Sequence, residues 1–140
     1  MSVDIPWRKD GLKDPTLISI VDDDESMREA VRSLIRSVGF RTETFSSAEQ
    51  FLKYDYIEKI DCLILDVRMP GMSGLELQRQ LGEAFWQTPI VFITAHEEAR
   101  AQALKDGAVG FLTKPFAEQD LLNAITQCIE QNIACVPRRT

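Results

Sequence analysis

The sequence contains one histidine and three cysteines, and no hydrophobic run approaches the length of a membrane-spanning helix. The cysteines form no Cys-x-x-Cys pair, and their odd number prevents complete internal pairing, so a reducing compartment fits this chain best. Residues 1–15 lack an apolar core like that of a signal peptide. We therefore expect a cytoplasmic protein without a membrane segment.

Basic charge is also scarce. Lysine and arginine total 16 residues against 22 aspartate and glutamate residues, which gives a formal net charge of −6. Binding to nucleic acid or to an anionic membrane requires clustered basic side chains, so we expect neither from this chain itself. The P-loop and Gly-x-Gly-x-x-Gly signatures of nucleotide-binding proteins are absent. The acidic balance is compatible with a carboxylate site for a hard cation.

The length of the chain favours a single domain. Its 140 residues, 44% of them hydrophobic, are enough to build one compact core. Residues 1–15 are polar, contain glycine and proline and show no period, which is typical of a tail. We expect one domain over residues 16–131 and a short C-terminal tail over residues 132–140.

Five short apolar runs alternate with longer amphipathic segments. Four of the runs are nearly continuous in hydrophobicity and rich in β-branched or aromatic residues, which favours strands buried on both faces of a parallel sheet. The run over residues 41–45 is more polar and alternates, which predicts an edge strand. The five runs cover residues 17–21, 41–45, 62–65, 90–93 and 109–112.

The segments between the runs repeat apolar residues at spacings of three and four, the period of a helix with one buried face. The sequence Ser-Ser-Ala-Glu over residues 46–49 predicts a capping box that opens the second of these helices. Five strand–helix repeats imply βαβ units with right-handed crossovers and helices on both faces of a sheet. The predicted fold class is therefore α/β: a (βα)5, doubly wound, five-stranded parallel sheet.

Chemically reactive side chains follow the ends of four of these runs. Ligands of open α/β sheets bind at the carboxyl ends of the strands, and in a parallel sheet these ends share one edge. We therefore expect carboxylates, a hydroxyl and an ammonium to converge there. The residues concerned are Asp22, Asp23 and Asp24 after the first run, Asp66 after the third, Thr94 and His96 after the fourth, and Lys114 after the fifth.

The chemistry of this set points to a cation and a phosphoryl group. Clustered carboxylates repel one another, and a divalent cation relieves the repulsion. Oxygen-only ligands with room for water favour Mg²⁺, for which Mn²⁺ could substitute. Lys114 offers a positive charge and Thr94 a hydrogen-bond donor for phosphoryl oxygens. Asp66 stands alone at the end of the central strand and is the best candidate for a nucleophile that forms an aspartyl phosphate.

Four segments resemble, in order, parts of the receiver domains of two-component response regulators. They are residues 20–25 (Ile-Val-Asp-Asp-Asp-Glu), 65–74 (Leu-Asp-Val-Arg-Met-Pro-Gly-Met-Ser-Gly), 94–96 (Thr-Ala-His) and 107–116 (Gly-Ala-Val-Gly-Phe-Leu-Thr-Lys-Pro-Phe). The details are similar to the FixJ-like subfamily. The resemblance covers about residues 17–130 and implies a flavodoxin-like or CheY-like fold with strand order 2-1-3-4-5.

The resemblance implies a role for each residue at the strand ends. Asp66 would be the phosphoacceptor and would receive its phosphoryl group from a sensor histidine kinase. Asp23, Asp66 and the backbone carbonyl of Arg68 would bind Mg²⁺, with Asp22 acting mainly through a bound water. Lys114 would contact the phosphoryl group.

The resemblance also implies a switch. A cis bond before Pro115 would aim the preceding lysine. Thr94 and Phe111 would form a switch pair, in which the hydroxyl moves onto the phosphoryl group and the ring turns inward. The face of the fourth helix, fifth strand and fifth helix would then change its affinity for partners, including a second copy in a phosphorylation-linked homodimer. Arg68 and His96 lie two residues after the phosphoacceptor and the switch threonine, and we expect them to set the lifetime of the phosphoryl group.

Two other functions are open at this point. A pseudo-receiver has this fold without phosphotransfer, although every expected acidic, hydroxyl and lysine position is occupied here. A phosphohydrolase of the haloacid-dehalogenase type carries a second carboxylate two residues after its nucleophile, and Arg68 holds that position. We therefore expect a phosphoacceptor switch that phosphorylates and dephosphorylates only itself, and not an enzyme. FixJ-like regulators usually continue into a DNA-binding domain, so a chain ending at Thr140 is either a stand-alone receiver or a piece of a longer regulator, with its output partner unknown.

Overall fold

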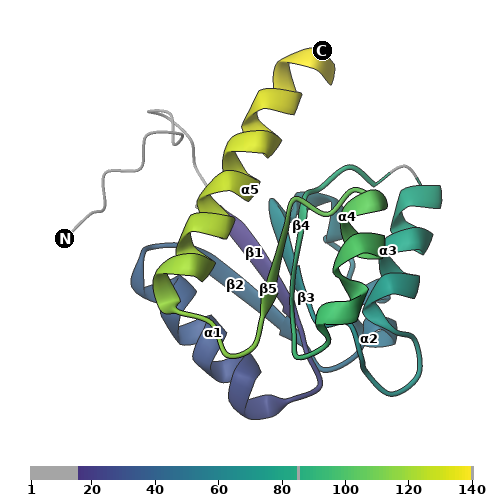
Figure 1. Cartoon of the computed structure of the whole chain (residues 1–140). Helices are drawn as coiled ribbons and strands as arrows, with labels where there is room; N and C mark the ends of the chain where they lie inside the picture. The colour runs from purple at the N-terminus through teal and green to yellow at the C-terminus, as the bar shows by residue number, and fades with distance from the viewer. Residues whose placement is uncertain (1–15, 85, 140) are drawn as a thin grey trace.

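The computed structural model describes residues 16–84 and 86–139, and the tail expected over residues 1–15 lies outside the described residues. Five parallel strands form one sheet in the order β2-β1-β3-β4-β5 (Figure 1). The strands are β1 Leu17–Val21, β2 Arg41–Phe45, β3 Cys62–Leu65, β4 Ile90–Thr94 and β5 Gly110–Thr113. The predicted α/β fold class and strand order are confirmed.

Helices cover both faces of the sheet, as crossovers between parallel strands require (Figure 1). Helices α1 and α5 pack on one face, and α2, α3 and α4 pack on the other. The helices are α1 Glu25–Ser37, α2 Ala48–Leu52, α3 Gly74–Glu83, α4 Arg100–Lys105 and α5 Glu118–Arg139, with short 3₁₀ turns η1 Ile57–Lys59 and η2 Glu97–Ala99. The boundary expected at residue 131 falls inside α5.

The sheet separates two hydrophobic layers. Val31 of α1 and Ile125 of α5 belong to one layer, and Phe51 of α2 and Leu77 of α3 belong to the other. Every residue of β1, β3 and β4 is buried, because these strands are covered on both faces. This burial explains why their sequences are nearly continuous in hydrophobicity.

Strand β2 lies at one edge of the sheet, as predicted. Its side chains alternate between exposed and partly buried until Phe45, which is buried. An edge strand has a neighbour on one side only, and its more polar sequence fits that position. Among the described residues, none of the helices combines the length and the apolar composition needed to cross a membrane.

Helix α2 begins differently from the prediction. Ser47 is its N-cap and accepts a hydrogen bond from the backbone N–H of Gln50 at 3.0 Å. The carboxamide oxygen of Gln50 accepts a bond from the N–H of Ser46, whereas Glu49 accepts one from the N–H of Met72 at 2.9 Å. The capping box predicted over residues 46–49 is therefore wrong, because its glutamate binds the loop between β3 and α3 instead.

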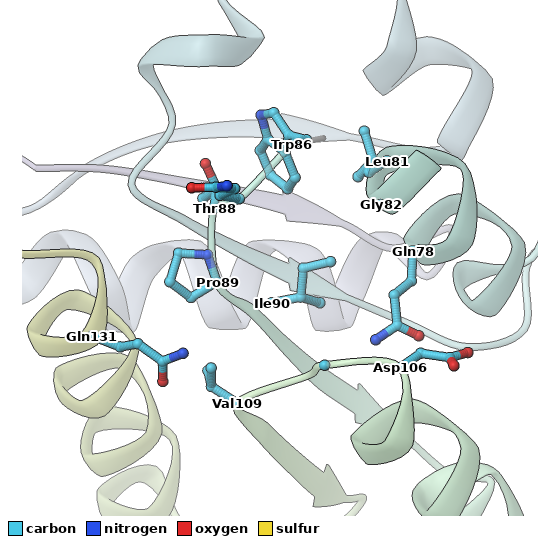
Figure 2. A pocket seen from close by; sticks show the side chains of 12 residues that line it. Gln78, Leu81, Gly82, Trp86, Thr88, Pro89, Ile90, Asp106, Val109 and Gln131 are labelled. Carbon is cyan, nitrogen blue, oxygen red and sulfur yellow. The ribbon is translucent and has the colours of Figure 1, made fainter. Parts of the chain in front are cut away.

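A cavity of about 290 Å³ opens at the amino ends of β4 and β5 (Figure 2). Trp86 and Pro89 line it just before β4, and Val109 lines it just before β5. Gln78 of α3 also lines it and donates a hydrogen bond to the carbonyl of Ala103 in α4 at 2.9 Å. This cavity lies at the opposite edge of the sheet from the strand ends that carry the acidic residues.

Candidate functional site

The carboxyl ends of β1 and β3 bring the acidic residues together. Val21 and Leu65 are register partners in neighbouring strands, so Asp22 and Asp66 leave the sheet side by side. Carboxylate oxygens of Asp22, Asp23 and Asp66 all lie within 4.8 Å of one another. Parallel pairing thus places Asp66 in one cluster with Asp22 and Asp23, from which it is distant in the sequence.

Lys114 reaches this cluster from the end of β5. Its ammonium nitrogen lies 3.4 Å from Oδ2 of Asp22 and 3.5 Å from Oδ2 of Asp66. Its backbone N–H donates to the carbonyl of Thr94 at 2.8 Å, which continues the pairing of β5 with β4. The Lys114–Pro115 peptide bond is cis, the geometry that the sequence resemblance implies. The ammonium group of Lys114 therefore lies between the carboxylates of Asp22 and Asp66.

Burial perturbs the acidity of Asp22. Loss of solvent raises its pKa to about 6, and the nearby Asp66 charge adds to this rise. The N–H of Asp24, which donates to Oδ1 of Asp22 at 2.9 Å, and the charge of Lys114 both oppose the increase in pKa. Asp24 also caps α1 by accepting a bond from the N–H of Ser26 at 3.0 Å.

The donor set fits a hard divalent cation. All three acids offer oxygen ligands, and the charge of Lys114 does not neutralise three carboxylates. Asp22 and Asp66 are buried, whereas Asp23 is exposed, so one side of the cluster faces solvent. Mg²⁺ prefers one or two protein carboxylates and keeps several waters, which this open side allows. Asp22, Asp23 and Asp66 are therefore the residues that could hold it.

The predicted switch residues lie on the neighbouring strands β4 and β5. Thr94 is fully buried at the end of β4, and its hydroxyl oxygen accepts a bond from the N–H of His96 at 3.2 Å. Phe111 is buried in β5, with its ring centroid 6.1 Å from that of Phe92. The guanidinium carbon of Arg100 lies 4.9 Å from the centre of the Phe111 ring. The ring is therefore covered from the α4 side.

Arg68 and His96 extend outward from the strand ends and meet at a third residue. Nη2 of Arg68 lies 3.0 Å from Oε2 of Glu98, and Nδ1 of His96 lies 3.5 Å from the same oxygen. All three side chains are at least partly exposed. The structure thus links the two residues that the sequence predicts to act on the lifetime of a phosphoryl group.

A family comparison decides the identity of this arrangement. Residues 18–126 match the family described as "Response regulator receiver domain". The chain belongs to this family. The match covers most of the chain and includes every residue of the acidic cluster together with Lys114.

The receiver domain is also similar to curated response regulators. It is 50% identical over 117 residues to the response regulator protein TmoT of Ectopseudomonas mendocina, covering 82% of this chain and 53% of that protein. It is 36% identical over 119 residues to the transcriptional regulatory protein FixJ of Rhizobium meliloti, covering 84% and 58%. The chain thus spans about half the length of the curated relatives that it matches. The FixJ-like character predicted from the sequence is confirmed.

Solved structures agree with this receiver fold. The response regulator StyR matches with a TM-score of 0.83 and 49% identity over 89% of this chain and 64% of that chain. The response regulator TrrA of Thermotoga maritima, solved in complex with Mg²⁺ and BeF, matches with a TM-score of 0.74 and 26% identity over 81% and 98%.

The sequence did not indicate several residues that shape this receiver site. A Cβ atom added to Gly74 would lie 2.0 Å from the carbonyl oxygen of Asp66, so only glycine fits there. Glu49 and Glu98 hold the loops after β3 and β4 by hydrogen bonds to residues distant in the sequence. A surface glutamate carries no sequence signal for such a contact. Gly74, by contrast, ends the Met-Pro-Gly-Met-Ser-Gly stretch and could have been identified as a position of close backbone approach.

Proposed function

We propose that this receiver domain is a phosphorylation switch, in which Asp66 accepts a phosphoryl group from the phosphohistidine of a sensor kinase in a Mg²⁺-dependent reaction. The observation that carries this proposal is the 3.5 Å contact between Nζ of Lys114 and Oδ2 of Asp66, next to the acidic cluster. An ammonium in that position meets the negative oxygens of a phosphoryl group attached to Asp66.

The transfer uses the carboxylate of Asp66 as the nucleophile. One of its oxygens attacks phosphorus, the phosphorus–nitrogen bond breaks, and the kinase histidine keeps the electron pair. Asp23, Asp66 and the backbone carbonyl of Arg68 would hold the cation, with Asp22 acting mainly through a water molecule. Bound Mg²⁺ supplies positive charge to the phosphoryl oxygens. The Mg²⁺ and BeF complex of the similar TrrA supports this choice of cation.

Thr94 and Phe111 transmit the change of charge at Asp66. An aspartyl phosphate carries a charge of about −2 in place of the single negative charge of the carboxylate, and the hydroxyl of Thr94 donates to the new oxygens. The 3.2 Å bond that the Thr94 oxygen accepts from the N–H of His96 uses a lone pair and leaves the hydroxyl proton for this donation. Phe111 responds by turning further inward, which changes the surface of α4, β5 and α5. That surface then binds an output partner or a second copy of the chain.

The same site argues against an enzyme that acts on external phosphate esters. Aspartate-based phosphohydrolases use a second carboxylate two residues after the nucleophile as acid and base, and here Arg68 holds that position. A pseudo-receiver is disfavoured because Asp66, Asp23, Thr94 and Lys114 are all present and lie at the same edge of the sheet. The chemistry of the domain is therefore its own phosphorylation and dephosphorylation.

Receiver domains of response regulators interact with sensor histidine kinases, and we assign this chain such a kinase as its phosphodonor. That role places the domain in the cytoplasm, where these kinases present their phosphohistidine. The relatives' greater length is consistent with an output domain that acts on DNA, while the net charge of −6 disfavours DNA binding by this part itself.

Incubation with acetyl phosphate and Mg²⁺, followed by intact-mass measurement, tests the proposal. Wild-type protein should gain one phosphoryl group, and the gain should disappear with a chelator or in Asp66→Asn. Asp120→Asn, which removes a carboxylate from α5, serves as the matched control and should be labelled like the wild type. No gain on the wild type, or an equal gain on Asp66→Asn, would exclude Asp66 as the acceptor.

A further inference from the structure

Glu98 links two loops that leave the sheet beside Asp66. Its Oε2 atom lies 3.0 Å from Nη2 of Arg68 and 3.5 Å from Nδ1 of His96. Arg68 follows Asp66 by two residues, and His96 follows Thr94 by two residues, on the neighbouring strands β3 and β4. One carboxylate oxygen therefore joins the loop after β3 to the loop after β4, on the solvent side of the strand ends.

The backbone of Glu98 is itself held in place. It belongs to the 3₁₀ turn η2, whose Ala99 is buried against the core. The preceding Glu97 binds Arg100 and the hydroxyl of Thr113 at the end of β5. Because the turn fixes the backbone of Glu98, pairing with Arg68 costs side-chain freedom only and requires no ordering of the chain around the glutamate.

We propose that Glu98 is a positioning residue that keeps Arg68 and His96 bridged over phosphorylated Asp66 and thereby slows hydrolysis of the phosphoryl group. This inference rests on the function proposed above. In hydrolysis a water oxygen attacks phosphorus, the phosphorus–oxygen bond to Asp66 breaks, and the electron pair returns to the carboxylate. The water proton leaves with inorganic phosphate or passes to solvent. The bridge narrows the approach of that water from the solvent side.

Glu98 also determines which negatively charged group Arg68 contacts. Bound to Glu98, the guanidinium is neutralised at the rim of the site, which leaves Lys114 as the cation in contact with Asp66 among the described residues. Without Glu98, Arg68 and His96 separate and the two loops are no longer joined. Water then reaches the phosphoryl group more easily, so we expect its lifetime to shorten.

The test follows the decay of the phosphorylated protein. Wild type, Glu98→Ala, Arg68→Ala and the double variant are phosphorylated with acetyl phosphate and Mg²⁺, the donor is removed, and loss of the phosphoryl group is followed by intact mass. Glu98→Ala should raise the decay rate about two- to fivefold, the range expected for one exposed ion pair. Arg68→Ala should raise it by a similar factor.

The double variant separates positioning from a general structural effect. If Glu98 acts through Arg68, the double variant should decay no faster than either single variant. Glu29→Ala is the matched control, because Glu29 is an exposed glutamate paired with Arg32 at 3.2 Å in α1, and its decay should equal that of the wild type. Circular dichroism of each variant should match the wild type, since all the replaced side chains are partly exposed.

Several results would overturn the inference. Unchanged or slower decay in Glu98→Ala contradicts it, and so does a double variant whose rise is the product of the two single rises. A wild type that gains no phosphoryl group overturns the proposed function and this inference with it. A wild type that is phosphorylated normally, with equal decay in Glu98→Ala, overturns the inference alone.

Discussion

The ammonium nitrogen of Lys114 lies 3.4 Å from Oδ2 of Asp22, although 92 residues separate the two along the chain. The contact joins the end of β5 to the end of β1 across the carboxyl edge of the sheet. Because it favours the ionised carboxylate, it opposes the effect of burial on the pKa of Asp22. The acidity of Asp22 therefore depends on a residue from the far side of the sheet.

Replacement of Lys114 by a neutral residue should make Asp22 a weaker acid. Lys114→Met removes the positive charge and keeps most of the side-chain volume, so the pKa of Asp22 should rise above its value of about 6. Carbon-detected NMR of the side-chain carboxyl groups measures the titration directly. Lys105→Met, at the end of α4, is the control and should leave the titration unchanged. An Asp22 midpoint that falls or does not move in Lys114→Met would contradict the assignment.

Asp22 should reduce stability at neutral pH when no cation is bound. Its pKa is raised from 3.8 to about 6, so the folded state holds the proton more tightly than the unfolded state. The stability linked to this group is therefore complete below pH 3.8 and is lost as the pH rises through 6. Asp22→Asn should increase the free energy of unfolding at pH 7.5 by about 1–2 kcal/mol, less than the roughly 3 kcal/mol of the full shift, because solvent screens the charge.

Urea unfolding with a chelator present, at pH 7.5 and at pH 4, measures this effect. The gain in Asp22→Asn should be present at the higher pH and small at the lower one. A variant that is less stable than the wild type at pH 7.5 would show that the ionised carboxylate is favourable in the folded state.

Binding of Mg²⁺ should offset the destabilisation caused by ionised Asp22. The stability that Mg²⁺ adds should increase as the pH rises, whereas the stability of the cation-free protein linked to Asp22 decreases. The cation binds the ionised carboxylates, so protons compete with it as the pH falls through 6. At about 100 times its dissociation constant, a ligand specific for the folded state adds about 2.7 kcal/mol to stability. Thermal unfolding should show a rise in Tm with Mg²⁺ at pH 7.5 that is largely lost at pH 5. An equal rise at both pH values would show that Asp22 does not control cation binding.

The strand pattern could be predicted because strands that are buried on both faces have nearly continuous apolar sequences. Strands β1, β3 and β4 are buried along their whole length and are apolar almost throughout, whereas the edge strand β2 alternates. Parallel pairing then brings the strand ends together, so the meeting of Asp22, Asp66 and Lys114 followed from their positions alone. The roles of the individual residues came from the family resemblance.

The contacts of exposed side chains could not be predicted in the same way. Glu49 lies where a capping glutamate would be expected, yet it binds Met72, 23 residues away. Glu98 binds Arg68, which is 30 residues distant. Both contacts depend on how two loops approach one another after the sheet has formed. A glutamate in a surface turn has the same local sequence whether or not it makes such a contact.

Gly74 should be among the least replaceable residues near the site. A Cβ atom there would lie 2.0 Å from the backbone oxygen of Asp66 and 3.1 Å from the Phe92 ring. Gly74→Ala should therefore destabilise the fold by about 3 kcal/mol, the upper range for overpacking, because the obstacle is backbone. Gly82→Ala, in the same helix with no atom within 4 Å of the added Cβ, should be neutral or stabilising by up to about 1 kcal/mol. Urea unfolding compares the two, and equal effects would contradict the clash.

Glu97 should stabilise the end of β5 in a way that disappears in acid. Its two carboxylate oxygens accept bonds from Nε of Arg100 at 2.5 Å and Nη2 at 3.0 Å, and it also accepts a bond from the hydroxyl of Thr113. These bonds lower its pKa from 4.5 to about 2. Because the folded state favours the ionised form, the contribution is present above pH 4.5 and is lost as the pH falls towards 2.

Glu97→Gln tests this contribution by removing the charge while keeping the shape. The difference in Tm between the wild type and Glu97→Gln should be constant from pH 5 to pH 7 and should shrink steadily below pH 4.5. Glu29→Gln provides the control, since Glu29 pairs with Arg32 by a single contact at 3.2 Å and makes no bond to a strand residue. A Tm difference for Glu97→Gln that is independent of pH would mean that the variant acts through packing. An effect of the Glu97 charge must disappear when the carboxylate is protonated.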